Sequence, residues 1–235
     1  MRISTFRLGA AALAMLLLQA CASNLQRDAR DPLEPVNRAI FGFNEAVDGA
    51  VLKPAATAYR DVAPRWIRNG VRNFFNNLQD AWSVVNNGLQ GRGEEMGDNL
   101  GRVMLNSSFG LFGVIDIATE AGIERHTADF GLTLGRWGVS PGPYVVLPVL
   151  GPFTLREVSA LPVEWSADPI NQLESPLSTG LTVVKLVDVR AGFLGADSVL
   201  GGAALDKYTF TRDAYLQRQR SHQYDGNPPE EDAAP

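Results

Sequence analysis

The chain has 235 residues, a formal net charge of −5 and 45% hydrophobic residues, enough apolar material for one sizeable folded core. Its acidic balance and the lack of basic patches argue against a nucleic-acid partner, and they exclude a general electrostatic attraction to anionic lipid headgroups. Cys21 is the only cysteine, so no intramolecular disulfide can form and stability has to come from burial.

Residues 1–20 have the pattern of a signal peptide. Two arginines precede an uninterrupted apolar stretch, residues 8–18, that is too short to span a bilayer. The tetrapeptide LQAC, which ends at Cys21, resembles the lipobox of bacterial lipoproteins, in which the cysteine sulfur receives a lipid. An ordinary signal peptide followed by a chance cysteine is the alternative. We therefore predict that residues 1–20 are removed and that Cys21 is the lipid attachment site of the mature protein.

The two ends of the mature chain flank one predicted folded unit. Residues 21–30 are small or polar and are typical of a short lipidated tether. Residues 221–235 combine proline, glycine and acidic side chains with few apolar ones, so burial there cannot offset the entropy cost of ordering. The sequence therefore predicts one domain over residues 31–220, followed by a disordered tail.

Helical periodicity dominates the predicted domain. Apolar residues recur every three or four positions in residues 35–52, and Asp31 with Pro32 supplies an N-terminal signal for this helix. Pro54 and Pro64 are expected to break the pattern. Further helices are predicted over 66–89, with an interruption at Gly70 left open, and over 94–107, 176–194 and 205–220. Strand-like alternation is limited to residues 144–147.

Two uncharged segments fit a water-soluble helical bundle poorly. Residues 137–155 contain prolines and glycines that exclude a continuous helix, and residues 103–115 are too short to span a bilayer. Irregular apolar backbone at membrane depth is tolerated only where it is buried in protein or lines a cavity. Ordinary core segments with tight turns are the alternative to a membrane-embedded arrangement.

These segments carry a resemblance to the MlaA (VacJ) family of outer-membrane lipoproteins. The matching motifs are DPLEPVNRAIFGFN (31–44), VRNFFNNL (71–78), LQGR (89–92), LGRVMLNSSFGLFGVIDIAT (100–119), DFGLTLGRWGVSPGPYVVLPVLGPFTLR (129–156) and YLQRQR (215–220). The resemblance covers the body from residue 31 to about 220. After Arg156 the family continues with aspartate and glycines, whereas this chain has Glu157, so the local structure of residues 157–175 is not predicted.

The resemblance implies an all-α fold, a ring of amphipathic helices with glycine- and proline-rich irregular segments that is embedded in the outer membrane. Such a ring encloses an amphipathic pore. Glycerophospholipids misplaced in the outer leaflet enter the pore and pass to a periplasmic carrier, MlaC, which maintains the lipid asymmetry of the outer membrane. The family also associates with trimeric porins. The implied protein faces the periplasm and has no cofactor, no metal site and no catalytic residue.

The resemblance also suggests which residues control the pore. The candidates belong to the opening helix and to a glycine-flanked turn, and they are Asp31, Asn37, Arg38, Phe41, Gly42, Phe43, Asn44, Gly110, Leu111, Phe112 and Gly113. Helix capping and surface ion pairing are the alternative roles for the charged members. Lys185 and Arg190 lie on an otherwise apolar helix and are candidates for contact with the lipid phosphate. Snorkelling of their long side chains is the alternative.

An enzyme and a structural scaffold are the two rival interpretations. His126 and His222 are the only histidines, and His222 lies in the predicted tail, so neither a Ser-His arrangement nor a zinc cluster can be assembled. Asp129 and Glu164 could in principle act as a carboxylate pair on glycans, but the sequence does not give their separation. A structural lipoprotein that scaffolds an envelope complex is the second rival, and it needs no path for a lipid.

Overall fold

The structure is a computed structural model that describes residues 28–197 and 206–229. The predicted signal peptide, the lipid attachment site Cys21 and most of the predicted tether lie outside the described residues. The elements in chain order are α2 (Glu34–Val47), the π-helical turn η1 (Asp48–Leu52), α3 (Lys53–Val62), α4 (Arg65–Leu89), α5 (Gly93–Ser108), α6 (Ile117–Glu120), α7 (Phe130–Arg136), β1 (Tyr144–Leu147), β2 (Gly151–Thr154), α8 (Leu155–Ala167), the 3-10 turn η2 (Pro169–Gln172), α9 (Leu177–Phe193) and α11 (Lys207–Gln223).

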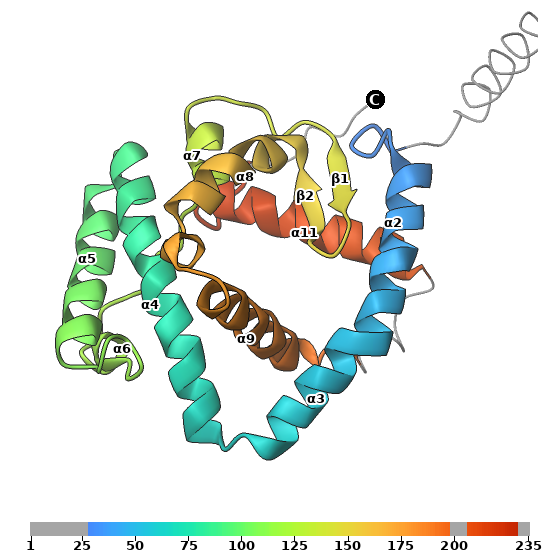
Figure 1. Cartoon of the computed structure of the whole chain (residues 1–235). Coiled ribbons are helices and arrows are strands. Elements are labelled where there is room, and N and C mark those ends of the chain that lie inside the picture. The colour runs from blue at the N-terminus through green and yellow to red at the C-terminus, as the bar shows by residue number, and fades with distance from the viewer. Residues whose placement is uncertain (1–27, 198–205, 230–235) are drawn as a thin grey trace, which may run out of the picture.

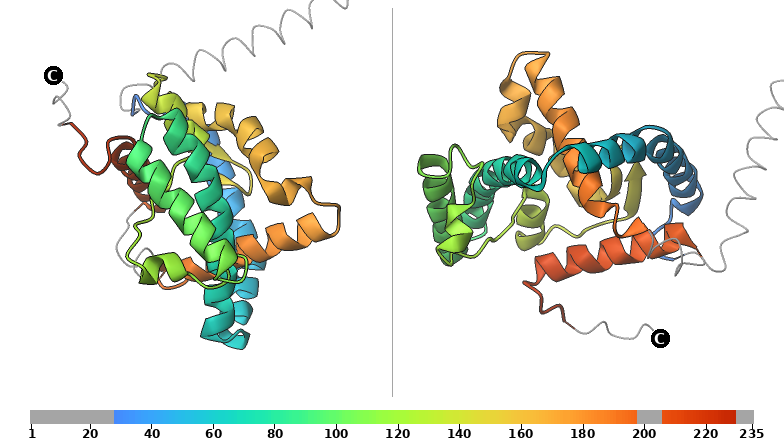
Figure 2. Two further views of the ribbon diagram at one scale, coloured as in Figure 1. Left: turned by 90° about the vertical axis from the view of Figure 1, so that its left-hand side faces the viewer. Right: turned by 90° about the horizontal axis from the view of Figure 1, so that it is seen from below.

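The helices are arranged as a ring, as predicted. Figure 1 shows α2, η1, α3 and α4 running round one half of the ring, while α7, α8, the β1–β2 hairpin and α11 complete the other half. α5 and α6 lie on the outer side of α4. α9 lies within the outline of the ring, and the view from below in Figure 2 shows it running from the α8 side towards α11. The fold is predominantly helical, and a small hairpin is added to the expected all-α architecture.

Pro54 does not break the first helix, contrary to the prediction. The chain passes from α2 through η1 into α3 without a loop, and the Lys53 N–H donates to the carbonyl of Asp48, the i→i−5 bond of a π-turn. Pro54 therefore falls in the first turn of α3, where the missing N–H of a proline costs little. Pro64 does separate two helices, because it is the N-cap of α4 and has an extended backbone.

α4 continues through Gly70, so the interruption left open there does not occur. A Cβ on Gly70 would lie 2.9 Å from Cγ1 of Val114, in the loop that follows α5. The glycine therefore allows that loop to approach α4 closely. The helices predicted over 94–107, 176–194 and 205–220 correspond to α5, α9 and α11.

β1 is the strand predicted over 144–147, but its partner β2 was not predicted. The two strands pair antiparallel, with Tyr144 opposite Thr154 and Leu147 opposite Gly151. Thr154 then begins α8 directly, because its hydroxyl accepts from the Glu157 N–H while the Glu157 carboxylate accepts from the Thr154 N–H, a capping box. Residues 157–175, for which no structure was predicted, form the rest of α8 and η2.

The folded body is wider than the predicted range 31–220. Asp28 forms an ion pair with Arg212 of α11, with 3.1 Å between the charged atoms. At the other end α11 continues to Gln223, and Asp225 forms an ion pair with Arg92 of 2.7 Å. The residues next to the body are polar, so charge pairing rather than apolar burial holds them against it.

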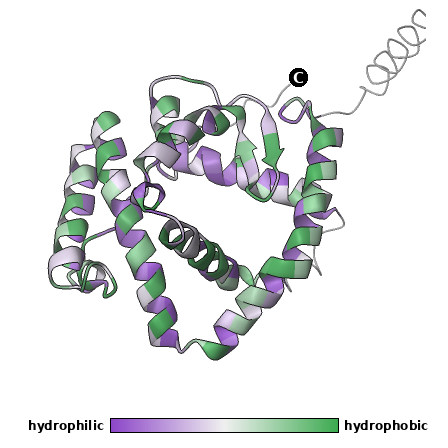
Figure 3. Cartoon of the chain, viewed as in Figure 1, coloured by the Kyte–Doolittle hydropathy of each residue, from purple (hydrophilic) through white to green (hydrophobic). Residues whose placement is uncertain are grey.

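The buried side chains of this ring are largely polar, whereas many of its large apolar side chains are exposed. The buried polar set includes asparagines, aspartates and arginines on α2, α4, α5 and α11, and the small apolar cluster consists of Tyr144, Val146 and Tyr208. Exposed apolar side chains occur on most helices, and Figure 3 shows α9 coloured largely as hydrophobic. In the described part of the chain, no helix combines the length and the hydropathy needed to cross a membrane.

Candidate functional site

Asp31, immediately before α2, lies in the interior of the protein. It is fully buried and accepts hydrogen bonds from Asn37 Nδ2 at 2.8 Å and from the Tyr208 hydroxyl at 2.5 Å. Arg212 Nη1 lies 3.5 Å from the same carboxylate. Helix capping and surface pairing, the alternative roles considered for this aspartate, are therefore not what its side chain does here. It anchors the start of α2 to α11.

Asn37 extends this anchor to the hairpin. Its Nδ2 also donates to the Tyr144 carbonyl at 3.0 Å, and its Oδ1 accepts from the Val146 N–H at 2.9 Å. Asn44, two turns further along α2, repeats the pattern on the Leu147 carbonyl at 2.9 Å and the Val149 N–H at 2.7 Å. The two amides hold the hairpin against α2 through its main chain, because they match the donors and acceptors that the strand edge leaves unpaired.

Arg38 joins α2 to the beginning of α11. It donates to both oxygens of the Asp206 carboxylate at 3.1 and 2.6 Å, and it lies 4.4 Å above the Tyr208 ring. The hydrogen bonds from Arg38 hold the pKa of the Asp206 carboxyl well below its usual range. Phe41 meets the same Tyr208 ring edge-on, with 5.6 Å between the centroids. Phe41 and Arg38 thus pack around one tyrosine.

Gly42 and Phe43 lie on α2 without a comparable role in packing. A Cβ on Gly42 would meet nothing within 4 Å, and the Phe43 ring is about half exposed. Of the candidates on the opening helix, the structure brings Asp31, Asn37, Arg38 and Phe41 together. It leaves Gly42 and Phe43 on the open side of the helix.

The turn at residues 110–113 presents apolar side chains on a rigid backbone. Leu111 and Phe112 have positive φ angles of 52° and 58°, and their side chains are 65% and 80% exposed, far more than apolar groups that pack in a core. A Cβ on Gly110 would lie 2.1 Å from the Ile115 carbonyl oxygen, and one on Gly113 would overlap Asn77. The two glycines are therefore required for a turn that projects both side chains away from the protein.

A buried charge network holds the base of this turn, and sequence reasoning missed it. Arg102 Nε pairs with Asp80 at 3.1 Å, its Nη2 pairs with Asp116 at 3.0 Å, and its Nη1 donates to the Ile123 carbonyl. Arg125 Nε lies 2.5 Å from the same Asp80 carboxylate. The available signal was the arginine, which sits with Asn99 and Asn106 at helical spacing on one face of α5.

The two phosphate-contact candidates are in different situations. Arg190 is engaged, since its Nε and Nη2 donate to Asp48 at 2.6 and 2.9 Å and its Nη2 also reaches Asp197. Lys185 has one carboxylate partner, Asp168 at 3.5 Å, and its side chain is almost half exposed. Its Nζ also lies 6.0 Å from the centre of the Phe75 ring on α4, so Lys185 is the less engaged of the two cations.

The groups considered for catalysis are committed to structural hydrogen bonds. Glu164 accepts from the Trp82 indole at 2.7 Å and from the Phe130 N–H, while Asp129 caps α7 through the Leu132 N–H. Burial raises the pKa of both carboxyls. His126 and His222 line one open pocket, and among the described residues no hydrogen bond links Ser221 in that pocket to either ring. No described group of residues could hold a metal ion.

Taken together, the fold and the site define a class: predominantly helical, ring-shaped proteins with a polar interior brace and an exposed apolar surface. A family model described as MlaA lipoprotein matches residues 29–222. The chain is 37% identical to the intermembrane phospholipid transport system lipoprotein MlaA of Escherichia coli (strain K12), over 90% of this chain and 86% of that protein. It is 32% identical to the Haemophilus influenzae protein of the same name, over 92% and 90% of the two chains.

A solved structure described as the structural basis for maintenance of bacterial outer membrane lipid asymmetry matches with a TM-score of 0.74 at 37% identity. The match covers 86% of this chain and 100% of that one. The chain therefore belongs to the MlaA lipoprotein family, and the resemblance inferred from its motifs is confirmed.

Proposed function

We propose that this protein performs intermembrane phospholipid transport, removing mislocalised glycerophospholipids from the outer leaflet of the outer membrane and so maintaining its lipid asymmetry. The observation that carries the proposal is the 37% identity, over nine-tenths of the chain, to a lipoprotein named for that transport system. Such similarity along the whole body preserves the arrangement of the helices, on which a path for lipid depends.

The distribution of polar and apolar groups supports this function. A two-tailed lipid crossing a protein needs apolar contact for its tails and polar groups near its headgroup, and the protein around it needs satisfied backbone hydrogen bonds. The ring exposes apolar side chains on most helices, while buried polar side chains pair with one another inside it, as Arg102 does with Asp80 and Asn37 with Asp31. This surface suits a ring embedded in the outer membrane by its outer side, anchored by lipid at Cys21 and facing the periplasm.

Within the ring we assign control of the path to two segments. The anchored start of α2, with the candidates from Asp31 to Asn44, can move only if the links to β1 and α11 open together. The turn at 110–113 has no space for a side chain at Gly110 or Gly113, and it presents Leu111 and Phe112 outward. Lys185 is the group we expect to meet the lipid phosphate. The periplasmic carrier MlaC would receive the lipid, and a trimeric porin would hold the ring in the membrane.

The alternative, a structural lipoprotein that scaffolds an envelope complex, predicts no lipid movement. The test uses the full-length acylated protein in vesicles that carry fluorescent phosphatidylglycerol, with MlaC as acceptor in solution. Transport predicts that fluorescent lipid appears on MlaC only when the vesicles contain the protein. Equal transfer from protein-free vesicles would overturn the proposed function and leave the scaffold.

A further inference from the structure

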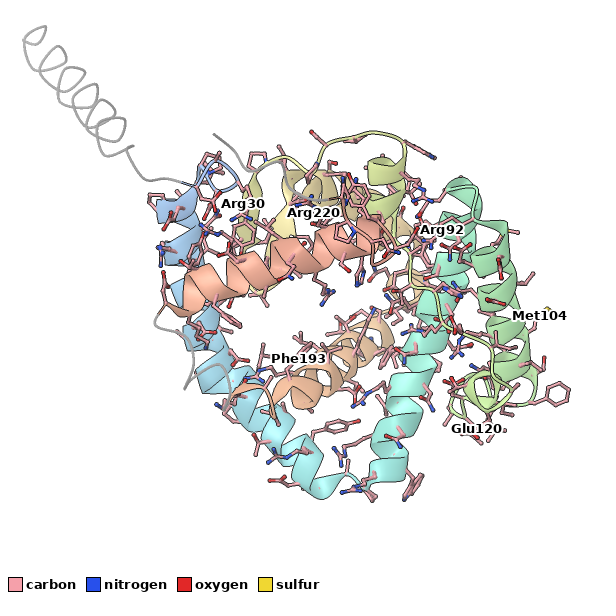
Figure 4. All side chains as sticks on the ribbon, turned by 180° about the vertical axis from the view of Figure 1, so that it is seen from behind. Arg30, Arg92, Met104, Glu120, Phe193 and Arg220 are labelled. Atoms are coloured by element: carbon pink, nitrogen blue, oxygen red, sulfur yellow. The ribbon has the colours of Figure 1, made fainter. Side chains whose placement is uncertain are left out.

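The seam between the end of α11 and the corner of α4 and α5 contains an open, polar pocket. Figure 4 labels Arg220 on α11 and Arg92 at that corner, and it shows α11 running towards the corner. The volume of this seam pocket is about 280 Å³, whereas one water molecule needs only roughly 10–15 Å³. The lining residues are Arg92, His126 and Thr127 on one side and Ser221, His222, Asp225 and Gly226 on the other. None of them belongs to α2, α9 or the 110–113 turn.

Asp225 lies where the chain leaves α11, in a conformation that glycine usually occupies. Its φ angle is +53°, and the next N–H, that of Gly226, donates to the Ser221 carbonyl at 2.8 Å, the Schellman arrangement that ends many helices. Aspartate is one of the few residues with a Cβ that tolerate the left-handed region. Glycine would satisfy the turn itself, so the contribution of Asp225 lies in its carboxylate.

Two arginines from different elements converge on this carboxylate. Arg92 Nη2, in the turn between α4 and α5, lies 2.7 Å from Asp225 Oδ1, and Arg136 Nη1, at the end of α7, lies 3.5 Å from Oδ2. Arg92 also pairs with Glu95 at 2.9 Å, whereas in the described part of the chain Arg136 pairs with no carboxylate besides that of Asp225. Two guanidinium groups that face one carboxylate form a cationic wall that another small oxyanion could use.

The rest of the seam pocket supplies further polar groups. Among the described residues, the side chains of Thr127, Ser221 and His222 make no hydrogen bond, and those of Thr127 and Ser221 are partly buried. His126 lies 3.1 Å from Asp98. Two hydroxyls and an imidazole beside two guanidinium groups suit a tetrahedral oxyanion better than a planar carboxylate, because its oxygens accept hydrogen bonds from several directions.

We infer that the seam pocket binds a phosphoryl oxyanion, either free phosphate or the phosphate of a lipid headgroup, and that Asp225 occupies its cationic wall when the anion is absent. Because Asp225 is tethered to α11, its effective concentration at the two arginines is high, and an anion has to compete with it. Binding would displace the carboxylate and release residues 224–229 from the corner of α4 and α5. The inference does not depend on lipid transport.

The first test measures anion binding by isothermal titration calorimetry on the full-length acylated protein in detergent, at low salt so that exposed charges are not screened. Inorganic phosphate and glycerophosphoglycerol, the soluble headgroup of phosphatidylglycerol, are titrated separately. Asp225→Asn removes the internal competitor and keeps a residue that tolerates the left-handed conformation. Asp61→Asn is the matched control, because it removes one exposed carboxylate, paired with Arg60, and changes the net charge equally.

Asp225→Asn is expected to bind one or both anions more tightly than the wild type by about fivefold or more, because the tethered competitor is gone. Asp61→Asn should match the wild type, and adding Arg92→Gln to Asp225→Asn should reverse the gain. Tighter binding of phosphate would identify free phosphate as the ligand, and tighter binding of glycerophosphoglycerol would identify a lipid headgroup. Equal affinities of the wild type and Asp225→Asn for both anions would overturn the inference.

Hydrogen exchange provides a second measurement on the unaltered protein. Saturation with the anion that binds should speed amide exchange in residues 224–229, where the Gly226 N–H now bonds to the Ser221 carbonyl, and should leave the middle of α11 around Tyr215 unchanged. Unchanged exchange in residues 224–229 would mean that the anion and Asp225 do not compete, and the inference would be wrong. Neither measurement involves lipid transfer, so the proposed transport function stands or falls separately.

Discussion

Asn37 Nδ2 donates a hydrogen bond of 2.8 Å to Asp31 Oδ1, and both side chains are fully buried. The same amide binds the main chain of β1, and the same carboxylate binds two side chains of α11. Three elements that are distant in the sequence therefore meet at one amide–carboxylate pair. Any opening of the ring at α2 has to break this pair.

Asn37→Leu is expected to lower the free energy of unfolding by about 3–5 kcal/mol, because it leaves several buried polar groups without a partner. Urea denaturation of the detergent-solubilised protein, followed by tryptophan fluorescence, measures the change. Asn171→Leu is the control, since Asn171 is exposed and its side chain donates a hydrogen bond to the Trp165 carbonyl. Equal losses of unfolding free energy in the two variants would show that the hydrogen bonds of Asn37 contribute little to stability.

Gly42→Ala is expected to stabilise the protein by about 0.5–1 kcal/mol. Gly42 lies inside α2, and the added methyl group would meet nothing within 4 Å, so the gain in helix propensity has no steric cost. The same denaturation experiment measures it. If Gly42 also serves as a flexible point of a gate, lipid transfer should fall in the stabilised variant. A destabilised Gly42→Ala protein would contradict the open position of this residue.

Gly110→Ala is expected to destabilise the 110–113 turn by about 3 kcal/mol or more. The new Cβ would lie 2.1 Å from the Ile115 carbonyl oxygen and 2.5 Å from that of Asn106, and both are main-chain atoms that cannot move alone. Gly97→Ala on α5 is the matched control, because its Cβ would meet nothing within 4 Å. Thermal denaturation should separate the two variants, and similar melting temperatures would argue against a rigid turn.

Asp80→Asn is expected to cost about 3 kcal/mol, because it leaves the buried Arg102 and its neighbour Arg125 with one carboxylate fewer. Asp61→Asn removes an exposed carboxylate paired with Arg60 and should change stability by less than about 0.5 kcal/mol. Chemical denaturation of both variants measures the difference. A change at Asp80 as small as that at Asp61 would mean that the buried network does not hold the base of the turn.

Asp129 should make the stability of the protein depend on pH. Burial raises the pKa of its carboxyl above the ordinary 3.8, so between these two pKa values the folded protein holds a proton that the unfolded chain has lost. The contribution of this group to stability therefore falls as the pH rises through that window. Asp129→Asn keeps an oxygen acceptor for the Leu132 N–H and carries no charge.

The variant should accordingly lose less stability than the wild type as the pH rises above the ordinary pKa of 3.8, as measured by urea denaturation at several pH values. Glu164, whose pKa burial also raises, remains in both proteins and accounts for a residual slope. An identical pH profile for the two proteins would mean that Asp129 is ionised in the fold at no cost.

Local sequence patterns correctly predicted those helices and strands whose structure depends only on their own residues. The spacing of apolar residues predicted α4, α5, α9 and α11, Pro64 marked the start of α4, and alternation marked β1. The prediction of a helix break at Pro54 was wrong because a proline is tolerated in the first turn of a helix. The π-turn η1 places Pro54 in the first turn of α3, and no sequence pattern predicted this π-turn. β2 was missed because its glycine and proline are poor strand formers without a partner.

The sequence by itself determined that the segments of α2, α4, α5, α9 and α11 are helical, where charge is absent, and the family to which the chain belongs. Only the tertiary structure decided that Asp31 is buried and that Arg190 has two carboxylate partners while Lys185 has one. The reason is separation along the chain. Asp31 meets Tyr208 across 177 residues and Arg190 meets Asp48 across 142, and no local periodicity encodes such partners.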